Sequence, residues 1–158
     1  MHHRNRLALK VDTVQIETSR FGTLTVNEQD VLSLPEGMIG FPGLTRFVLF
    51  RHKEGSPFLW LQSLEDGGLA FVLTDPLLLV PDYELNITPE DTALLEVETP
   101  DNTVQAWAVV NIGRQEPREI TANLLAPVVI NPRTRLGKQV VLLESSYAIR
   151  HPVPVKGK

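Results

Sequence analysis

The sequence contains no cysteine, which excludes disulfide bonds and metal sites built on thiolates. It also has no apolar run close to the roughly 18 residues that a membrane-spanning helix requires. The basic residues near the N-terminus are not followed by a long apolar segment, so a signal peptide is not expected. These absences favour a cytoplasmic protein without a membrane anchor, and a chain of 158 residues is expected to form one domain.

Motifs of catalytic and cofactor-binding sites are missing as well. There is no Gly-x-Ser-x-Gly elbow, no Gly-Lys-Ser/Thr phosphate loop and no dinucleotide fingerprint. The four histidines are scattered, so no metal site is expected. Asp75, Asp82 and Glu84 are candidates for a carboxylate pair, but turn acids beside prolines are more often solvated than catalytic. We therefore expect a binding protein without a cofactor rather than an enzyme.

Positive charge is absent from the middle of the chain. Residues 54–113 contain eleven acidic side chains and neither Lys nor Arg, whereas all 15 basic residues lie outside this range. Charge of one sign steers a partner of the opposite sign, so the acidic middle predicts a basic partner; solvation of loops is the structural alternative. The same segment argues against direct binding to nucleic acid, because it would repel phosphates.

Short apolar stretches separated by turn residues predict an antiparallel β-protein. The expected strands are residues 14–18, 22–26, 30–34, 47–51, 58–62, 69–74, 104–112, 120–130 and 139–143, with an extended edge segment at 81–87 and a tail with prolines from 147. Three of them, from 47 to 74, are continuous apolar runs and predict central strands, with Trp60 in the core. In all, about nine to eleven strands and one short helix predict an all-β antiparallel barrel or sandwich.

Two non-strand segments are also predicted. Thr88 as N-cap, Pro89 in the first helical position and acids in the first turn predict a helix that ends near Leu95. Pro35–Gly43 is too rich in proline and glycine for a regular element. It predicts an ordered loop whose apolar residues Met38, Ile39 and Phe41 close one end of the barrel. In the strand at 104–112, the small side chains at 106 and 108 are expected to face inward.

The C-terminal hairpin is the most informative stretch. Its two apolar runs, 120–130 and 139–143, are joined by a polar turn in which Gly137 is expected to take a positive φ. Pro127 cannot donate to a sheet, so its strand is expected to lie at an edge or to be bulged. An open edge is also a surface that an extended segment of a partner can join.

Five segments in order carry a family resemblance. They are PEGMIGFPGLTRFVL from Pro35, PFLWLQSLED from Pro57, Asp75-Pro76, Pro81-Asp82-Tyr83, and TANLLAPVVINP with GKQVV from Thr121. Together they resemble the FliW family of flagellar assembly factors over roughly residues 14–152. The expected organisation is one FliW-like β domain at 13–152, with a flexible N-terminal segment at 1–12 and a flexible tail at 153–158.

The resemblance implies a monomeric, non-enzymatic cytoplasmic protein that binds flagellin and also the carbon storage regulator CsrA, an RNA-binding translational repressor. Flagellin would occupy the protein until its export; the free protein would then bind CsrA, and translation of flagellin would resume. In the family this antagonism is regarded as acting beside the RNA site of the regulator. A basic regulator would also give the acidic middle of the chain a use.

Three places are predicted to bind partners, because they offer apolar anchors, charge with an aromatic ring, and an edge strand. These residues are Phe41 and Pro42; Asp82, Tyr83 and Glu84; and Asn123 and Leu124. Their structural alternatives are a barrel plug, a half-buried edge residue and the amide of a bulge. The alternative functions are a barrel that holds a small apolar ligand, a hydrolase with an unrecognised carboxylate pair, and an RNA-binding protein. A ligand barrel needs an open interior, whereas the aromatic residues of the central strands suffice to fill a small one.

Overall fold

The computed structural model describes residues 12–98 and 103–154. Of the segments predicted to be flexible, 1–11 and 155–158 lie outside the described residues, whereas Val153 N donates to Ile120 O at 2.9 Å and so belongs to the domain. Within these ranges there are ten strands, one α-helix and two short 3-10 helices. No described helix is long and apolar enough to cross a membrane. The strands are β1 Thr13–Thr18, β2 Gly22–Asn27, β3 Leu32–Ser33, β4 Arg46–Phe50, β5 Phe58–Ser63, β6 Ala70–Thr74, β7 Gln105–Ile112, β8 Ile120–Asn131, β9 Leu136–Gln139 and β10 His151–Pro152; the helices are η1 Glu28–Asp30, η2 Pro76–Leu78 and α1 Pro89–Leu94.

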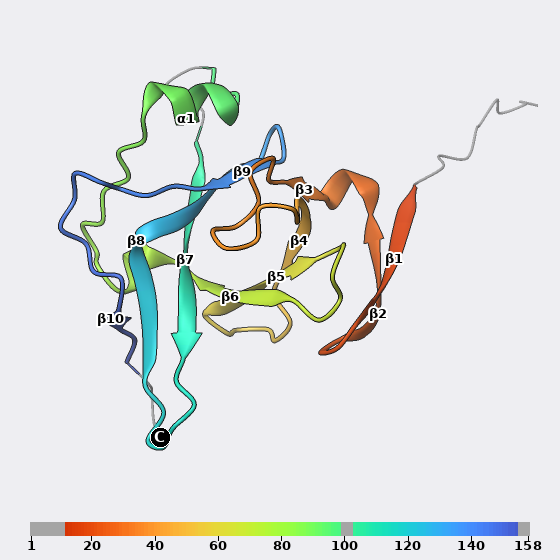
Figure 1. The fold of residues 1–158 in the computed structure, drawn as a ribbon, viewed down its shortest axis with the longest axis horizontal. Helices are drawn as coiled ribbons and strands as arrows, with labels where there is room; N and C mark the ends of the chain where they lie inside the picture. Colours follow the sequence, from red (N-terminus) through yellow and green to blue (C-terminus); the bar gives the residue numbers. More distant parts are fainter. Residues whose placement is uncertain (1–11, 99–102, 155–158) are drawn as a thin grey trace, which may run out of the picture.

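Seven strands close into a barrel (Figure 1). Strands β3 to β8 pair antiparallel in chain order, and β9 joins the two ends by pairing antiparallel with β8 and parallel with β3. The parallel contact between Ser33 and Leu136 makes the barrel mixed rather than wholly antiparallel. β10 extends the sheet beside β8, and β1 and β2 form a separate hairpin. The predicted β-barrel-like fold with about ten strands and one short helix is confirmed.

Apolar side chains fill the barrel interior. Its buried members are Leu32, Leu34, Met38, Phe47, Leu61, Leu73, Val128 and Ile130. Phe71, Trp107 and Val109 pack against them from neighbouring strands. Burying each such side chain contributes about 1.5 to 3 kcal/mol of stability. Because side chains occupy the interior, the structure disfavours the alternative of a barrel built around a small apolar ligand.

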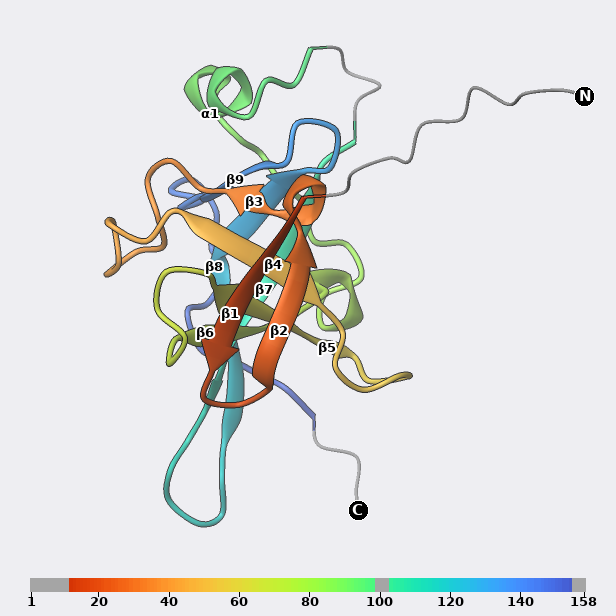
Figure 2. The same ribbon diagram turned by 90° about the vertical axis from the view of Figure 1, so that its right-hand side faces the viewer.

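Two predictions about facing were wrong. Trp60 lies on the outer side of the barrel, where Phe21 from the β1–β2 hairpin packs edge-on against it at 5.2 Å between ring centroids. Figure 2 shows this hairpin crossing the outside of the barrel. In β7 the inward residues are Trp107 and Val109, while Ala108 belongs to an outer cluster. Alternation alone cannot tell inside from outside when both faces of a strand are covered.

The outer face of β8 and β9 carries its own apolar layer. Leu95, which follows α1, is fully buried against Val129, Val140 and Leu142. Residues 81–87 were predicted as an extended edge segment, and they pair with no strand in the described chain. Their alternation still holds, because Tyr83, Leu85 and Ile87 pack onto this layer. The segment therefore covers the barrel as an extended strap that leads into α1 (Figure 1).

Helix α1 begins and ends as the sequence predicted. The Thr88 hydroxyl accepts a hydrogen bond from Asp91 N at 3.1 Å, which is the expected N-cap. At the other end, the Asn131 side chain donates to the Leu95 carbonyl at 2.8 Å, and Thr134 Oγ1 donates to the same oxygen at 3.1 Å. A six-residue helix has little stability of its own, so these contacts hold it in place.

The β8–β9 turn differs from its prediction in one respect. The residue with positive φ is Arg135, at 64°, and not Gly137. Gly137 lies inside β9, where a Cβ atom would stand 3.1 Å from Leu34 Cδ1. Its small size therefore serves close packing rather than turn geometry. The second strand accordingly starts at Leu136 instead of at 139.

The bulge predicted at Pro127 is present. Trp107 pairs with Val128 and Val109 pairs with Asn123, so four residues of β8 lie opposite the single residue Ala108. The strand lies inside the sheet, flanked by β7, β9 and β10, so the bulge rather than an edge accommodates the proline.

Candidate partner-binding surface

Tyr83 links the acidic strap to the bulge of β8. Its hydroxyl donates a hydrogen bond to the Leu124 carbonyl at 2.6 Å. Its ring lies 4.5 Å from that of Tyr147, between centroids, and the Tyr147 hydroxyl accepts from Glu84 N at 2.7 Å. Tyr83 is half-buried, whereas the flanking Asp82 and Glu84 are exposed. The tyrosine thus anchors the segment, and the two carboxylates face outward.

Asn123 is the side chain that shapes the bulge. Its Oδ1 accepts hydrogen bonds from Leu125 N and Ala126 N, both at 3.0 Å. Leu124 is 1% exposed and its backbone N–H donates to Ala148 O at 3.0 Å. The prediction of an open strand edge at Asn123 and Leu124 was wrong, because this main chain is already paired within the protein. The hydrogen bonds of Asn123 agree with the structural alternative, in which its side-chain amide stabilises the bulge.

Gln139 connects the bulge to the loop that carries Phe41. Its Nε2 donates to Ala126 O at 3.0 Å, and its Oε1 accepts from Ile39 N at 2.9 Å. Because Ala126 is also bound by Asn123, one relay of hydrogen bonds runs from the loop to the bulge. Tyr83 extends it to the strap through Leu124. The three predicted places are therefore connected through Gln139, which lies in the GKQVV segment but was not among the predicted binding residues.

The loop at 35–43 presents its apolar residues unequally. Met38 is 2% exposed and belongs to the core, while Ile39 is 59% and Phe41 39% exposed. The prediction that all three close the barrel is correct for Met38 only. The Phe41 ring meets Phe71 edge-on at 5.7 Å, and Pro42 beside it is exposed. Phe41 and Pro42 thus form a small apolar projection at the surface.

Acidic side chains gather along the strap and α1. Residues 82–98 contain no Lys or Arg, and the exposed acidic residues there are Asp82, Glu84, Glu90, Glu96 and Glu98. The sixth, Asp91, is buried and contacts Lys138 Nζ at 2.5 Å. Chemically, such a surface can attract positively charged groups. In the described part of the chain, no three His, Asp or Glu side chains converge as ligands for a metal ion.

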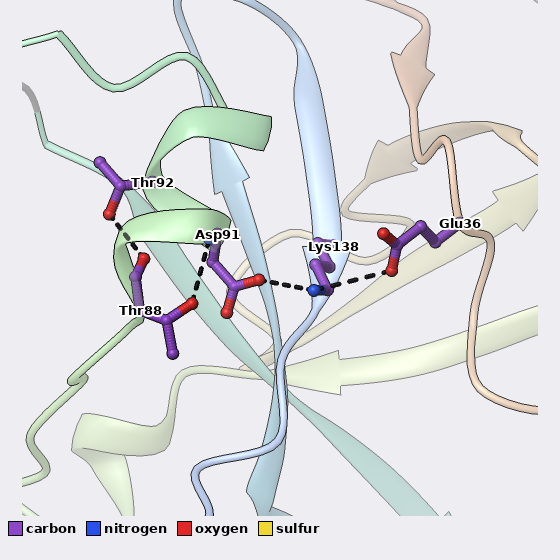
Figure 3. Close-up of polar contacts among 5 residues, drawn as sticks. All are labelled: Glu36, Thr88, Asp91, Thr92 and Lys138. Carbon is purple, nitrogen blue, oxygen red and sulfur yellow. Dashed lines mark hydrogen bonds and ion pairs between the residues drawn. The ribbon is translucent and has the colours of Figure 1, made fainter.

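Lys138 ties α1 to the barrel and was not foreseen from the sequence. Besides Asp91 it reaches Glu36 Oε1 at 3.6 Å, so one ammonium bridges the helix and the loop at 35–43 (Figure 3). The hydrogen bond to Asp91 raises the pKa of Lys138, against the opposing effect of its burial. Nothing in the local sequence pattern of β9 indicates these partners, because both lie far away along the chain.

Replacing Tyr83 with Phe should destabilise the protein by about 1 to 2 kcal/mol, because the Leu124 carbonyl loses its donor. Burial, and to a smaller degree Tyr147, raises the pKa of the Tyr83 phenol above its ordinary value of 10.0. The folded state therefore favours the protonated phenol, and this stability is lost as the pH rises above 10.0. Urea unfolding at pH 8 and above pH 10 measures both effects.

The alkaline loss should be smaller in Tyr83→Phe than in the wild type. Tyr147→Phe is the matched control, because it keeps the Tyr83 hydroxyl and its bond to Leu124. An unchanged alkaline profile in Tyr83→Phe would show that the buried phenol does not contribute to the pH dependence of stability.

Comparison with known proteins identifies the family. The family model described as "FliW protein" matches residues 15–153. The chain belongs to the FliW family. The flagellar assembly factor FliW of Natranaerobius thermophilus is 37% identical over 140 residues, which cover 89% of this chain and 92% of that protein. The flagellar assembly factor FliW of Geobacter sulfurreducens is 40% identical over 139 residues, covering 88% and 86%.

A solved structure agrees. A crystal structure of the flagellar assembly factor FliW superposes with a TM-score of 0.79 at 32% identity, over 88% of this chain and 96% of that one. The FliW family is one of non-enzymatic assembly factors, as the sequence resemblance implied. The segments that carry this resemblance include the loop at 35–43, Tyr83, the β8 bulge and Gln139. These are the parts that the hydrogen-bond relay joins.

Proposed function

We propose that this protein is a flagellar assembly factor that binds flagellin and the repressor CsrA in alternation. Flagellin occupies the protein while it accumulates in the cytoplasm. Once export removes flagellin, the free protein, acting as a single copy, binds CsrA. The regulator then releases flagellin mRNA, and translation resumes. Membership of the FliW family supports the flagellar role, since relatives with this length and fold are named flagellar assembly factors.

The observation that carries the proposal is the exposed acidic layer on residues 82–98. An RNA-binding regulator presents basic groups to phosphates, and such a surface complements carboxylates. We assign Asp82 and Glu84 to contacts with CsrA, because Tyr83 holds them outward between two fixed anchor points. Long-range attraction of this kind raises the association rate and weakens as salt increases.

The same proposal gives the apolar projection to flagellin. Phe41 and Pro42 are exposed and lie on a loop that Gln139 ties to the barrel, which suits an apolar anchor. Leu124 is buried, so its role is to receive the Tyr83 hydrogen bond, while Asn123 maintains the bulge. These two residues would hold Tyr83 and the bulge in position without contacting a partner themselves.

Titration of the protein against CsrA and against flagellin tests the assignment. The double variant Asp82→Lys with Glu84→Lys should bind CsrA at least about tenfold more weakly, a loss of about 1.4 kcal/mol. It should retain flagellin binding. The matched control is Glu54→Lys with Glu119→Lys, which changes the net charge equally on exposed loops outside the strap.

The salt dependence of CsrA binding is a second measurement that tests the assignment. CsrA binding by the wild type should weaken from low to moderate salt, and this dependence should be reduced in the strap variant only. If the control variant loses CsrA affinity as strongly as the strap variant, net charge rather than the strap is responsible. If neither partner binds the wild type at any salt concentration, the partner switch is refuted.

A further inference from the structure

A groove lies between the strap and the segment that follows β9. It has a volume of about 650 Å³ and is walled by residues 84–88 on one side and 140–147 on the other. Exposed apolar side chains lie on the second wall, where Leu143 is 85% and Val141 42% exposed. These two side chains give the second wall an exposed apolar surface next to the groove.

The second wall begins as a continuation of β9 and then turns, with Leu143 N donating to Val141 O at 3.0 Å. Val140 N donates to Pro127 O at 2.9 Å and Leu142 N donates to Leu125 O at 2.8 Å, so residues 140–142 continue the pairing of β9 with β8. Side chains alternate accordingly, with Val140 and Leu142 buried and Val141 exposed. The N–H of Val141 consequently points away from β8, and it has no hydrogen-bond partner in the described chain.

The first wall is also extended and unpaired. Ile87 packs onto the outer apolar layer, whereas Glu84 and Asn86 are exposed. Within residues 12–98 and 103–154, the backbone N–H groups of Asn86 and Ile87 make no hydrogen bond. Two segments that carry unpaired backbone donors thus line one groove. Unpaired strand edges with these properties are sites where another strand adds.

The charge of the residues that line the groove indicates what kind of peptide could bind there. Glu84 and Glu144 line the groove, which has no Lys or Arg among its lining residues. We propose that the groove binds an extended peptide segment of a partner protein in which basic and apolar residues alternate. The segment runs alongside Val141, its backbone carbonyl accepting from Val141 N–H, while Val141 O is already bound by Leu143 N. Its apolar side chains cover Val141 and Leu143, and its basic side chains reach the two carboxylates.

This inference shares Glu84 with the contacts proposed for CsrA, and it adds the wall at 140–147 and the backbone donor of Val141, which the proposed function does not use. It also places the open strand edge about twenty residues beyond Asn123 and Leu124, where the sequence had predicted it. In the bulge of β8, the N–H groups of Leu125 and Ala126 are bonded to the Asn123 side chain, whereas after β9 the N–H of Val141 is unpaired within the described residues.

A nuclear magnetic resonance titration of the isotope-labelled protein tests the proposal. The probe is a short synthetic peptide that alternates lysine and valine. Amide shifts should be confined to residues 84–88 and 140–147. The variant Val141→Pro, at an exposed residue, lacks the unpaired N–H that the peptide carbonyl is proposed to accept from, so it should bind the peptide at least about tenfold more weakly. A glutamate–valine peptide should not bind.

Variants of the protein give the matching test. Glu84→Gln with Glu144→Gln should weaken the lysine–valine peptide about tenfold, whereas Glu54→Gln with Glu119→Gln, on other exposed loops, should not. Equal affinity of the Val141→Pro variant for the peptide overturns the backbone contact at Val141. Equal affinity for the acidic peptide overturns the charge assignment. No binding, or shifts spread over other surfaces, overturns the groove as the site.

Discussion

Replacing Lys138 with Met should lower the free energy of unfolding by about 2 to 4 kcal/mol, one of the largest losses expected from a single polar residue here. The Asp91 side chain is only 8% exposed, and its carboxylate contacts Lys138 Nζ at 2.5 Å. Without the ammonium, that carboxylate remains buried with no counter-charge. Because α1 has only six residues, the helix should also detach locally. Urea unfolding and amide hydrogen exchange of α1 measure the two effects.

Two variants separate the contributions of this ion pair. Glu36→Gln should cost no more than about 0.5 kcal/mol, because that carboxylate is half exposed and 3.6 Å away. Asp91→Asn removes the buried charge itself, so combining it with Lys138→Met should restore part of the loss. Additive losses in the double variant would show that the two groups do not act as a pair.

The same pair predicts a pH dependence. Since the folded state raises the pKa of Lys138, its stabilising effect is complete below the ordinary lysine value of 10.5 and is lost as the pH rises beyond it. In Asp91→Asn the hydrogen bond that raises this pKa is gone, so the alkaline loss should be smaller. An identical profile in both proteins would contradict the assignment.

Gly37→Ala should destabilise the protein by about 3 kcal/mol and displace the loop that presents Phe41. Gly37 has a φ of +70°, which disfavours any side chain. A Cβ atom there would also press on Phe41 O and stand 2.8 Å from Pro42 Cα, both in the backbone. Neither neighbour can rotate away, so the loop has to open. Thermal unfolding gives the stability loss.

Gly40→Ala is a matched control in the same loop. Its φ of +93° is equally unfavourable, but a Cβ atom there would meet nothing within 4 Å. It should therefore cost only about 1 to 2 kcal/mol, from backbone strain alone. If Gly40→Ala and Gly37→Ala cost the same, close contact with Phe41 and Pro42 is not the reason for the glycine. Under the proposed function, Gly37→Ala should also weaken flagellin binding more than CsrA binding.

Local patterns were sufficient for much of the fold. The N-cap of α1 needs only Thr88, Pro89 and the acids that follow, because capping is a contact within one turn. Pro127 predicts a bulge since a missing N–H interrupts a ladder wherever it falls. The continuous apolar run at 58–62 indicates a strand for an equally local reason, and β5 is found there.

The predictions failed for strands whose two faces are both covered by other residues, because the inner face then had to be distinguished from the outer one. Trp60 and Ala108 belong to strands buried on both sides, so their apolar neighbours do not reveal which side is the barrel interior. The extended edge segment expected at 81–87 has the right alternation but no partner strand. Its alternation arises from packing onto the outer layer of β8 and β9, which gives the same period.

The sequence alone determined the class of fold, the short helix, the acidic middle and the resemblance to the FliW family, because each is a pattern of residue types along the chain and needs no knowledge of which distant residues touch. Only the tertiary structure decided how these parts meet. Lys138 is hydrogen-bonded to Asp91, 47 residues away in the sequence, and Gln139 to Ile39, 100 residues away. It also decided that the free strand edge follows β9 rather than lying at Asn123. When the barrel closes, strand pairing determines which backbone N–H groups are hydrogen-bonded. The strands that pair lie far apart in the sequence, so no local pattern identifies them.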